Sequence, residues 1–121
     1  MSKVIHWSKD ADIYLHYEPV DFRKSINGLS LIVEDAMEFS SMSGSLFVFC
    51  NKKWDKLKAL YWDESGFALW YKRLEKEKFR WPKNRAQSTL LMDSEQWDWL
   101  LRGFDINHMQ AHKKVHFSAL S

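Results

Sequence analysis

Basic and aromatic side chains alternate through the middle of the sequence, which is the composition of a surface that contacts nucleic acid. Lysine and arginine bind backbone phosphates, and exposed aromatic rings stack on unpaired bases with about 1–3 kcal/mol per base. The densest such stretch is Lys52–Pro82. The candidate nucleic-acid-binding residues, taken from it and from one earlier basic pair, are Arg23, Lys24, Lys56, Lys58, Trp70, Lys72, Arg73, Lys78, Arg80 and Trp81.

The same residues also fit an ordinary folded surface. Aromatic side chains are mostly buried, so burial in the core is favoured for any one of Trp54, Trp70 and Trp81. The lysines can equally solvate the outer face of a sheet. The sequence pattern therefore allows two interpretations of these basic residues, a phosphate-binding patch and a solvated sheet face.

Charge is unevenly distributed along the chain. The 121 residues carry 18 Lys and Arg against 16 Asp and Glu, a formal net charge of +2. Residues 46–85 hold eleven of the basic residues and five of the acidic ones, a net charge of +6. The rest of the chain then has seven basic and eleven acidic residues, a net charge of −4. This asymmetry favours a local patch for a polyanion such as DNA.

Patterns for catalysis and metal binding are weak. The sequence has no Gly-rich phosphate loop, no Cys-based metal spacing and no nucleophile elbow, so we expect neither enzyme activity nor a cofactor. His108, His112 and His116 would line one face of a helix, and imidazoles so placed can bind Zn²⁺ or Ni²⁺. We expect no native metal site there, because terminal segments are often disordered and no cysteine completes a ligand set.

Cysteine content and hydropathy indicate a cytoplasmic protein. Cys50 is the single cysteine, so no internal disulfide can form and a reducing compartment is favoured. No apolar run reaches membrane-spanning length, and the N-terminal residues lack the apolar core of a signal peptide. We therefore expect no membrane partner.

A β-hairpin is predicted to carry the central stretch. Its predicted parts are strand 56–62, turn 63–66, strand 67–74, turn 75–77 and a short extended run 79–81 that Pro82 ends. We expect Gly66 to take positive φ in the first turn. Because side chains alternate along a strand, one face of the hairpin is expected in the core and the other to form a wet, basic, aromatic surface.

Two helices flank this hairpin in the prediction. Apolar residues recur at helical spacing over 22–37, with Asp21 as the N-cap and Arg23 and Lys24 in the first turn. Cations in a first turn oppose the helix dipole, which favours a binding role for this pair. Gly28 weakens such a helix, so we expect close packing there. The second helix covers 94–102, with a capping box at its start and a glycine after its end.

The expected fold is a small α+β domain over residues 1–105, followed by an appended tail over 106–121. It has an antiparallel sheet of four to six short strands, one amphipathic helix packed on it and a short C-terminal helix. The further strands predicted are 13–15, 46–50 and 90–92. The free edges of such a sheet can support a homodimer.

Several spaced blocks of this sequence resemble the small accessory protein of the IS66 family of bacterial insertion sequences. This is the TnpB-type protein encoded beside the transposase, and not the RNA-guided nuclease of the same name. The blocks that carry the resemblance are Asp21, Arg23-Lys24, Gly28-Leu29, Ile32-Val33, Leu46–Phe49, Asp55–Lys58, Leu60, Trp62-Asp63, Gly66-Phe67, Leu69, Tyr71–Glu75, Phe79 and Trp81-Pro82. The blocks follow one order, which makes the resemblance specific, and the resemblance covers about residues 13–105. Glu77 and Ser25-Ile26 depart from the family pattern.

The resemblance implies a non-enzymatic accessory role in DNA transposition, a form of DNA recombination. Its implied partners are the transposase of the same element and DNA at the element ends. A second interpretation is a protein–protein adaptor that docks on the transposase without binding DNA. A third is a metal-dependent nuclease that uses the histidine tail.

Overall fold

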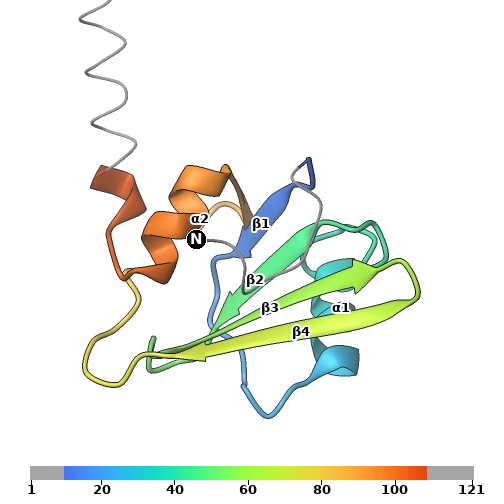
Figure 1. The fold of residues 1–121 in the computed structure, drawn as a ribbon, viewed down its shortest axis with the longest axis horizontal. Helices are drawn as coiled ribbons and strands as arrows, with labels where there is room; N and C mark the ends of the chain where they lie inside the picture. Colours follow the sequence, from blue (N-terminus) through green and yellow to red (C-terminus); the bar gives the residue numbers. More distant parts are fainter. Residues whose placement is uncertain (1–9, 109–121) are drawn as a thin grey trace, which may run out of the picture.

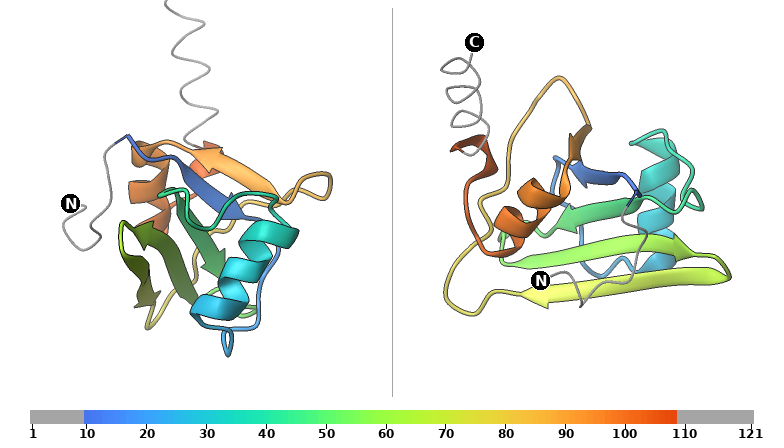
Figure 2. Two further views of the ribbon diagram at one scale, coloured as in Figure 1. Left: turned by 90° about the vertical axis from the view of Figure 1, so that its right-hand side faces the viewer. Right: turned by 45° about the horizontal axis from the view of Figure 1, so that its top comes forward.

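Residues 10–108 are described by the computed structural model, in which a mixed sheet has a helix on each side (Figures 1 and 2). The elements are β1 (Ile13–His16), α1 (Ile26–Asp35), β2 (Leu46–Cys50), β3 (Lys56–Asp63), β4 (Gly66–Arg73), β5 (Thr89–Met92) and α2 (Ser94–Leu101). The α+β class expected from the sequence is confirmed. Residues 1–9 and the tail histidines His112 and His116 lie outside the described residues.

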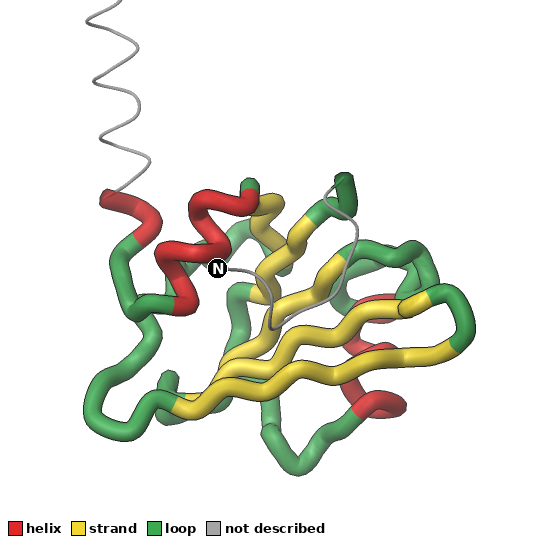
Figure 3. Tube along the Cα trace, viewed as in Figure 1, coloured by secondary structure: helices red, strands yellow, loops and turns green. Residues whose placement is uncertain are grey.

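The strands lie in the order β4-β3-β2-β1-β5 across the sheet (Figure 3). Three of the four pairings are antiparallel, as expected, but β1 and β2 run parallel. A parallel pair needs a long crossover between its strands, and the segment that contains α1 provides it. The sequence does not predict whether two such strands run parallel or antiparallel, because a short apolar run has the same pattern in either direction.

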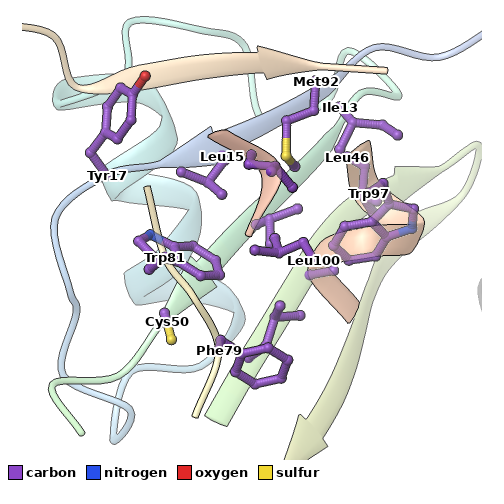
Figure 4. Close-up of a cluster of buried hydrophobic side chains, with 14 of the residues drawn as sticks. Ile13, Leu15, Tyr17, Leu46, Cys50, Phe79, Trp81, Met92, Trp97 and Leu100 are labelled. Carbon is purple, nitrogen blue, oxygen red and sulfur yellow. The ribbon is translucent and has the colours of Figure 1, made fainter. Parts of the chain in front are cut away.

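Both faces of the sheet are packed, so neither face of the β3–β4 hairpin is the wet surface that we expected. The face toward α2 holds the buried cluster of Ile13, Leu15, Tyr17, Leu46, Val48, Cys50, Leu57, Ala59, Tyr61, Phe79, Trp81, Met92, Trp97, Leu100 and Ile106 (Figure 4). The face toward α1 holds Val20, Leu29, Val33, Met37, Phe47, Phe49 and Leu60. Alternation along the strands produces this division. Because Ile106 is fully buried, the packed core extends at least to that residue.

Helix α1 begins at Ile26, four residues later than predicted. The carboxylate of Asp21 accepts hydrogen bonds from the backbone N and the side chain of Arg23, which closes a turn in place of a helical start. Ser25 is the N-cap, and its side chain makes no capping bond. Arg23 and Lys24 therefore precede the helix and are not part of its first turn. The close packing expected at Gly28 is confirmed, because a Cβ there would lie 3.0 Å from the Lys24 side chain.

Helix α2 begins where the sequence predicts and ends at Leu101, one residue earlier than predicted. The Asp93 carboxylate accepts from the Gln96 backbone N at 2.8 Å, and the Gln96 side chain accepts from the Asp93 backbone N at 3.0 Å. This reciprocal pair is the predicted capping box. Gly103 follows the helix with φ of 85°, a conformation that glycine adopts without a Cβ penalty.

Positive φ in the hairpin turn occurs at a different residue from the one predicted. Glu64 takes φ of 54°, whereas Gly66 is already the first residue of β4 and pairs with Asp63. The run 79–81 is also not a strand. Its Phe79 N donates to the Trp54 backbone oxygen over 2.7 Å, and the Phe79 and Trp81 side chains enter the core.

Candidate nucleic-acid interface

The two ends of the sheet differ in charge. At one end, residues 16–25, 50–56 and 72–88 come together, and we call these segments the basic end. It contains twelve Lys and Arg against five Asp and Glu. The basic residues are Arg23, Lys24, Lys52, Lys53, Lys56, Lys72, Arg73, Lys76, Lys78, Arg80, Lys83 and Arg85.

Strand pairing places these segments at one end. Register aligns the last residue of β1 with the first of β5, and the first residue of β3 with the last of β4. Hydrogen bonds then hold the connecting loops together: Val20 N to Cys50 O at 2.9 Å, Tyr17 N to Ser88 O at 3.0 Å, and Leu74 N to Asp55 O at 2.8 Å. The cations are thus gathered by topology from three separate stretches of sequence.

The opposite end of the sheet is acidic. It consists of residues 10–13, 34–46, 61–67 and 92–97, which we call the acidic end. These segments contain no lysine or arginine. Their nine acidic residues are Asp10, Asp12, Glu34, Asp35, Glu38, Asp63, Glu64, Asp93 and Glu95. The described domain therefore has a strong charge asymmetry along the direction of its strands.

Several predicted site residues are exposed at the basic end. Arg23 forms an ion pair with Asp21 at 2.6 Å, and its hydrogen bonds hold the pKa of that carboxyl well below its usual range. Its side chain is still 91% exposed. Arg73 pairs with Glu75 at 2.8 Å on the surface. Lys24, Lys78 and Arg80 are exposed, and Lys56 is half-buried.

Lys58 has a structural role that the sequence did not suggest. Its Nζ donates to the backbone oxygens of Phe22 at 3.0 Å and Lys24 at 2.8 Å, and it lies 4.8 Å from the centroid of the Phe22 ring. Burial lowers the pKa of this ammonium group. Lys58 thus fixes the loop that carries Arg23 and Lys24 against the α1 face of the sheet.

Lys72 lies on the other face of the hairpin from Lys58. Its Nζ donates to the backbone oxygen of Leu101 at the C-terminal end of α2, over 2.8 Å. A cation at that position is favourable for the helix dipole. The predicted basic residues of β3 and β4 therefore do not share one face. They share one end of the sheet.

The tryptophans proposed for base stacking pack against other side chains of the protein. Trp81 is buried in the cluster shown in Figure 4. Its Nε1 donates to the His16 backbone oxygen at 2.9 Å. Its ring centroid lies 6.4 Å from that of Trp54. Trp70 is half-buried and makes an edge contact with Trp97. The aromatic part of the predicted surface is therefore largely core, while its cationic part is exposed.

A pocket with a volume of about 520 Å³ lies where the basic end meets the turn after α2. Its lining is Glu77, Lys78, Phe79, Arg80, Arg102, Gly103 and Phe104. Arg102 was not a predicted site residue, because it is far from the central stretch in sequence. The other cations left out of the predicted set are Lys52, Lys53, Lys76, Lys83 and Arg85. The net charge of residues 46–85 was the signal that could have included them.

Metal binding, membrane insertion and thiol chemistry have little support in the described residues. Within residues 10–108, no group of three or more His, Cys, Asp and Glu side chains is placed to hold a metal ion. No helix in that part of the chain has the length and apolarity to span a membrane. Burial raises the pKa of the Cys50 thiol to about 12, so this group is a poor nucleophile.

Comparison with known proteins agrees with the resemblance seen in the sequence motifs. The family described as IS66 Orf2-like protein matches residues 11–111, and the chain belongs to this family of insertion-sequence accessory proteins. Two relatives come from Sinorhizobium fredii (strain NBRC 101917 / NGR234), and both are uncharacterized. Protein y4jC is 38% identical over 81% of this chain and 83% of its own length. Protein y4hO is 31% identical over 74% of this chain and 77% of its own length. No solved structure matches the chain significantly.

Proposed function

We propose that this protein is a non-enzymatic accessory factor for transposition of its insertion sequence, and that it contacts element DNA through the basic end. The observation that carries the proposal is the separation of charge along the strands. Twelve cations and five acids gather at one end, against nine acids and no Lys or Arg at the other. The proposed location is the cytoplasm, where bacterial DNA and the transposase are found.

Phosphate contact is the mode of binding that this surface supports. Lys and Arg side chains neutralise backbone phosphates and release counterions, which gives affinity without sequence readout. Arg23, Lys24, Lys78 and Arg80 are exposed and supply such contacts. Base stacking has less support, because Trp81 is buried. We therefore expect duplex DNA to bind at least as tightly as single-stranded DNA.

The acidic end orients the protein on DNA. Its carboxylates repel a polyanion, and at moderate salt such repulsion acts over about 10 Å. The domain should therefore approach DNA with the C-terminal ends of β2 and β4 nearest to the DNA. This orientation leaves the acidic end available to a second protein such as the transposase.

Equilibrium binding of labelled duplex and single-stranded DNA across a salt series tests the proposal. The variant is Lys78→Ala/Arg80→Ala, which removes two exposed cations of the basic end. The matched control is Ser40→Glu/Met42→Glu, which makes the same change in net charge within the acidic end, at two exposed positions. The plot of log K against log salt has a negative slope, and each lost phosphate contact should reduce its magnitude by about 0.9.

We expect the basic-end variant to weaken DNA binding severalfold and to flatten the salt slope, and the control to bind as the wild type does. Equal weakening by both variants would mean that net charge, and not the basic end, governs binding. Absence of DNA binding at low salt would overturn the proposed contact. The basic end would then be a docking face for the transposase, as the adaptor interpretation requires.

A further inference from the structure

The two edges of the sheet differ in how they are protected. A free edge exposes unpaired backbone N–H and C=O groups, and proteins shield such edges with short strands, prolines, bulges or projecting lysines. Edge strand β5 has four residues, whereas edge strand β4 has eight. No strand among residues 10–108 pairs with the outer side of β4.

Strand β4 has few of the usual protecting features, and its one exposed charged residue, Arg73, lies at its last position. It contains no proline, and its pairing with β3 runs without a bulge from Gly66 to Arg73. Its one lysine, Lys72, does not project along the edge, because its Nζ is bonded to the Leu101 oxygen. Five consecutive residues of the strand are apolar or aromatic, namely Phe67, Ala68, Leu69, Trp70 and Tyr71. Tyr71 has 51% of its surface exposed.

The hairpin register shows which backbone groups of β4 are unpaired. Asp63 and Gly66 flank a two-residue turn and form the closing hydrogen-bonded pair. Because such pairs alternate with non-bonded ones, the backbone groups of every second residue from Phe67 point away from β3. Tyr71 is one of these residues, so its N–H is available to a neighbouring strand.

We propose that β4 pairs with β4 of a second copy of this chain, in the antiparallel sense, to form a continuous ten-stranded sheet. Two-fold symmetry requires this sense, since the same strand must serve both partners. Charge favours it as well. In antiparallel pairing, the exposed Arg73 of one copy lies near the Asp63–Glu64 turn of the other. A parallel arrangement would place basic end beside basic end.

The test is the mass of the full chain in solution, by size exclusion with light scattering over a concentration series. The variant is Tyr71→Pro, which removes the outward N–H without removing a bond to β3. Its matched control is Tyr71→Val, which keeps the N–H and the strand preference but loses the same ring. We expect dimers for the wild type and Tyr71→Val, and monomers for Tyr71→Pro with an unchanged circular dichroism spectrum.

A second variant tests the charge argument even where the proline substitution unfolds the protein. Asp63→Asn/Glu64→Asn neutralises the turn, and asparagine tolerates the positive φ at position 64. We expect the dimer dissociation constant to rise severalfold at low salt, and the difference from the wild type to disappear near 1 M salt. A wild-type chain that stays monomeric up to millimolar concentration would overturn the proposal, as would a dimer that neither variant weakens.

Discussion

The indole Nε1 of Trp81 donates a hydrogen bond to the backbone oxygen of His16 over 2.9 Å, although the two residues are 65 positions apart. This bond joins the segment after the hairpin to the first strand of the sheet. Both partners are buried, so water cannot replace a lost donor. Trp81 therefore stabilises the end of the sheet and does not stack on bases.

Trp81→Phe should lower the free energy of unfolding by about 2–4 kcal/mol, because the His16 oxygen loses its donor and a cavity forms beside Trp54. Urea unfolding measures this change. Trp62→Phe, at a half-buried position near the hairpin turn, is the matched control and should cost less. DNA affinity of the folded Trp81→Phe protein should equal that of the wild type. A loss of DNA affinity without a loss of stability would indicate that Trp81 contacts DNA, in contradiction to this account.

His16 gives the protein a predictable response to acid. Burial lowers the pKa of His16, and the charge of Glu18 and the backbone of Ser88 offset this only in part. In the folded protein its Nδ1 is buried without a hydrogen-bond partner among the described residues. The unfolded chain therefore binds a proton more readily than the folded one.

The stability contributed by neutral His16 should be complete above the unfolded pKa of about 6.5 and should be lost as pH falls below it. We expect the free energy of unfolding to decrease between pH 7.5 and pH 5.5 in the wild type. In His16→Gln, which cannot titrate, the decrease should be smaller. Parallel pH profiles for the two proteins would show that other groups cause the acid response.

Lys58 should stabilise the conformation of the loop that precedes α1. Lys58→Met removes its bonds to the Phe22 and Lys24 oxygens, and should cost about 1 kcal/mol of stability. Amide hydrogen exchange in residues 21–25 should become faster. The control is Lys56→Met, two residues earlier on the same face of β3, which should leave that exchange unchanged. Faster exchange in both variants would mean that charge, and not the Lys58 contacts, orders the loop.

The N-cap of α2 offers a prediction that rests on sequence and structure alike. Asp93→Ala removes the bond to the Gln96 backbone N and should lower the free energy of unfolding by about 1 kcal/mol. Asp93→Ser retains a capping oxygen and should be close to the wild type. Thermal unfolding followed by circular dichroism distinguishes them, and equal destabilisation by both substitutions would contradict the capping role.

Local patterns predicted the elements well because each depends on nearby residues. The capping box of Asp93 and Gln96 and the apolar run of β2 are examples. The start of α1 was wrong because Asp21 bonds to Arg23 in a turn, a competition that helical spacing does not reveal. The positive φ in the hairpin turn was assigned to Gly66 because glycine is the usual choice, but the register places it at Glu64.

The candidate site was predicted in composition but not in arrangement. Net charge over residues 46–85 indicated a basic patch, and the structure gathers those cations, except Lys58, at one end of the sheet. The prediction of a single basic and aromatic face was wrong, because both faces of the hairpin are packed and Lys58 and Lys72 lie on opposite ones. That outcome depends on which segments cover the sheet, and local alternation carries no information about them.

Backbone amide chemical shifts, recorded by NMR while a short duplex DNA is added at low salt, test the central claim most directly. We predict that the perturbed amides lie in residues 50–56 and 72–88, and that amides in residues 34–46 and 61–67 keep their positions. The perturbations should disappear when salt is raised, as phosphate contacts require. Perturbations centred on the acidic end, or none at all at low salt, would contradict DNA contact through the basic end.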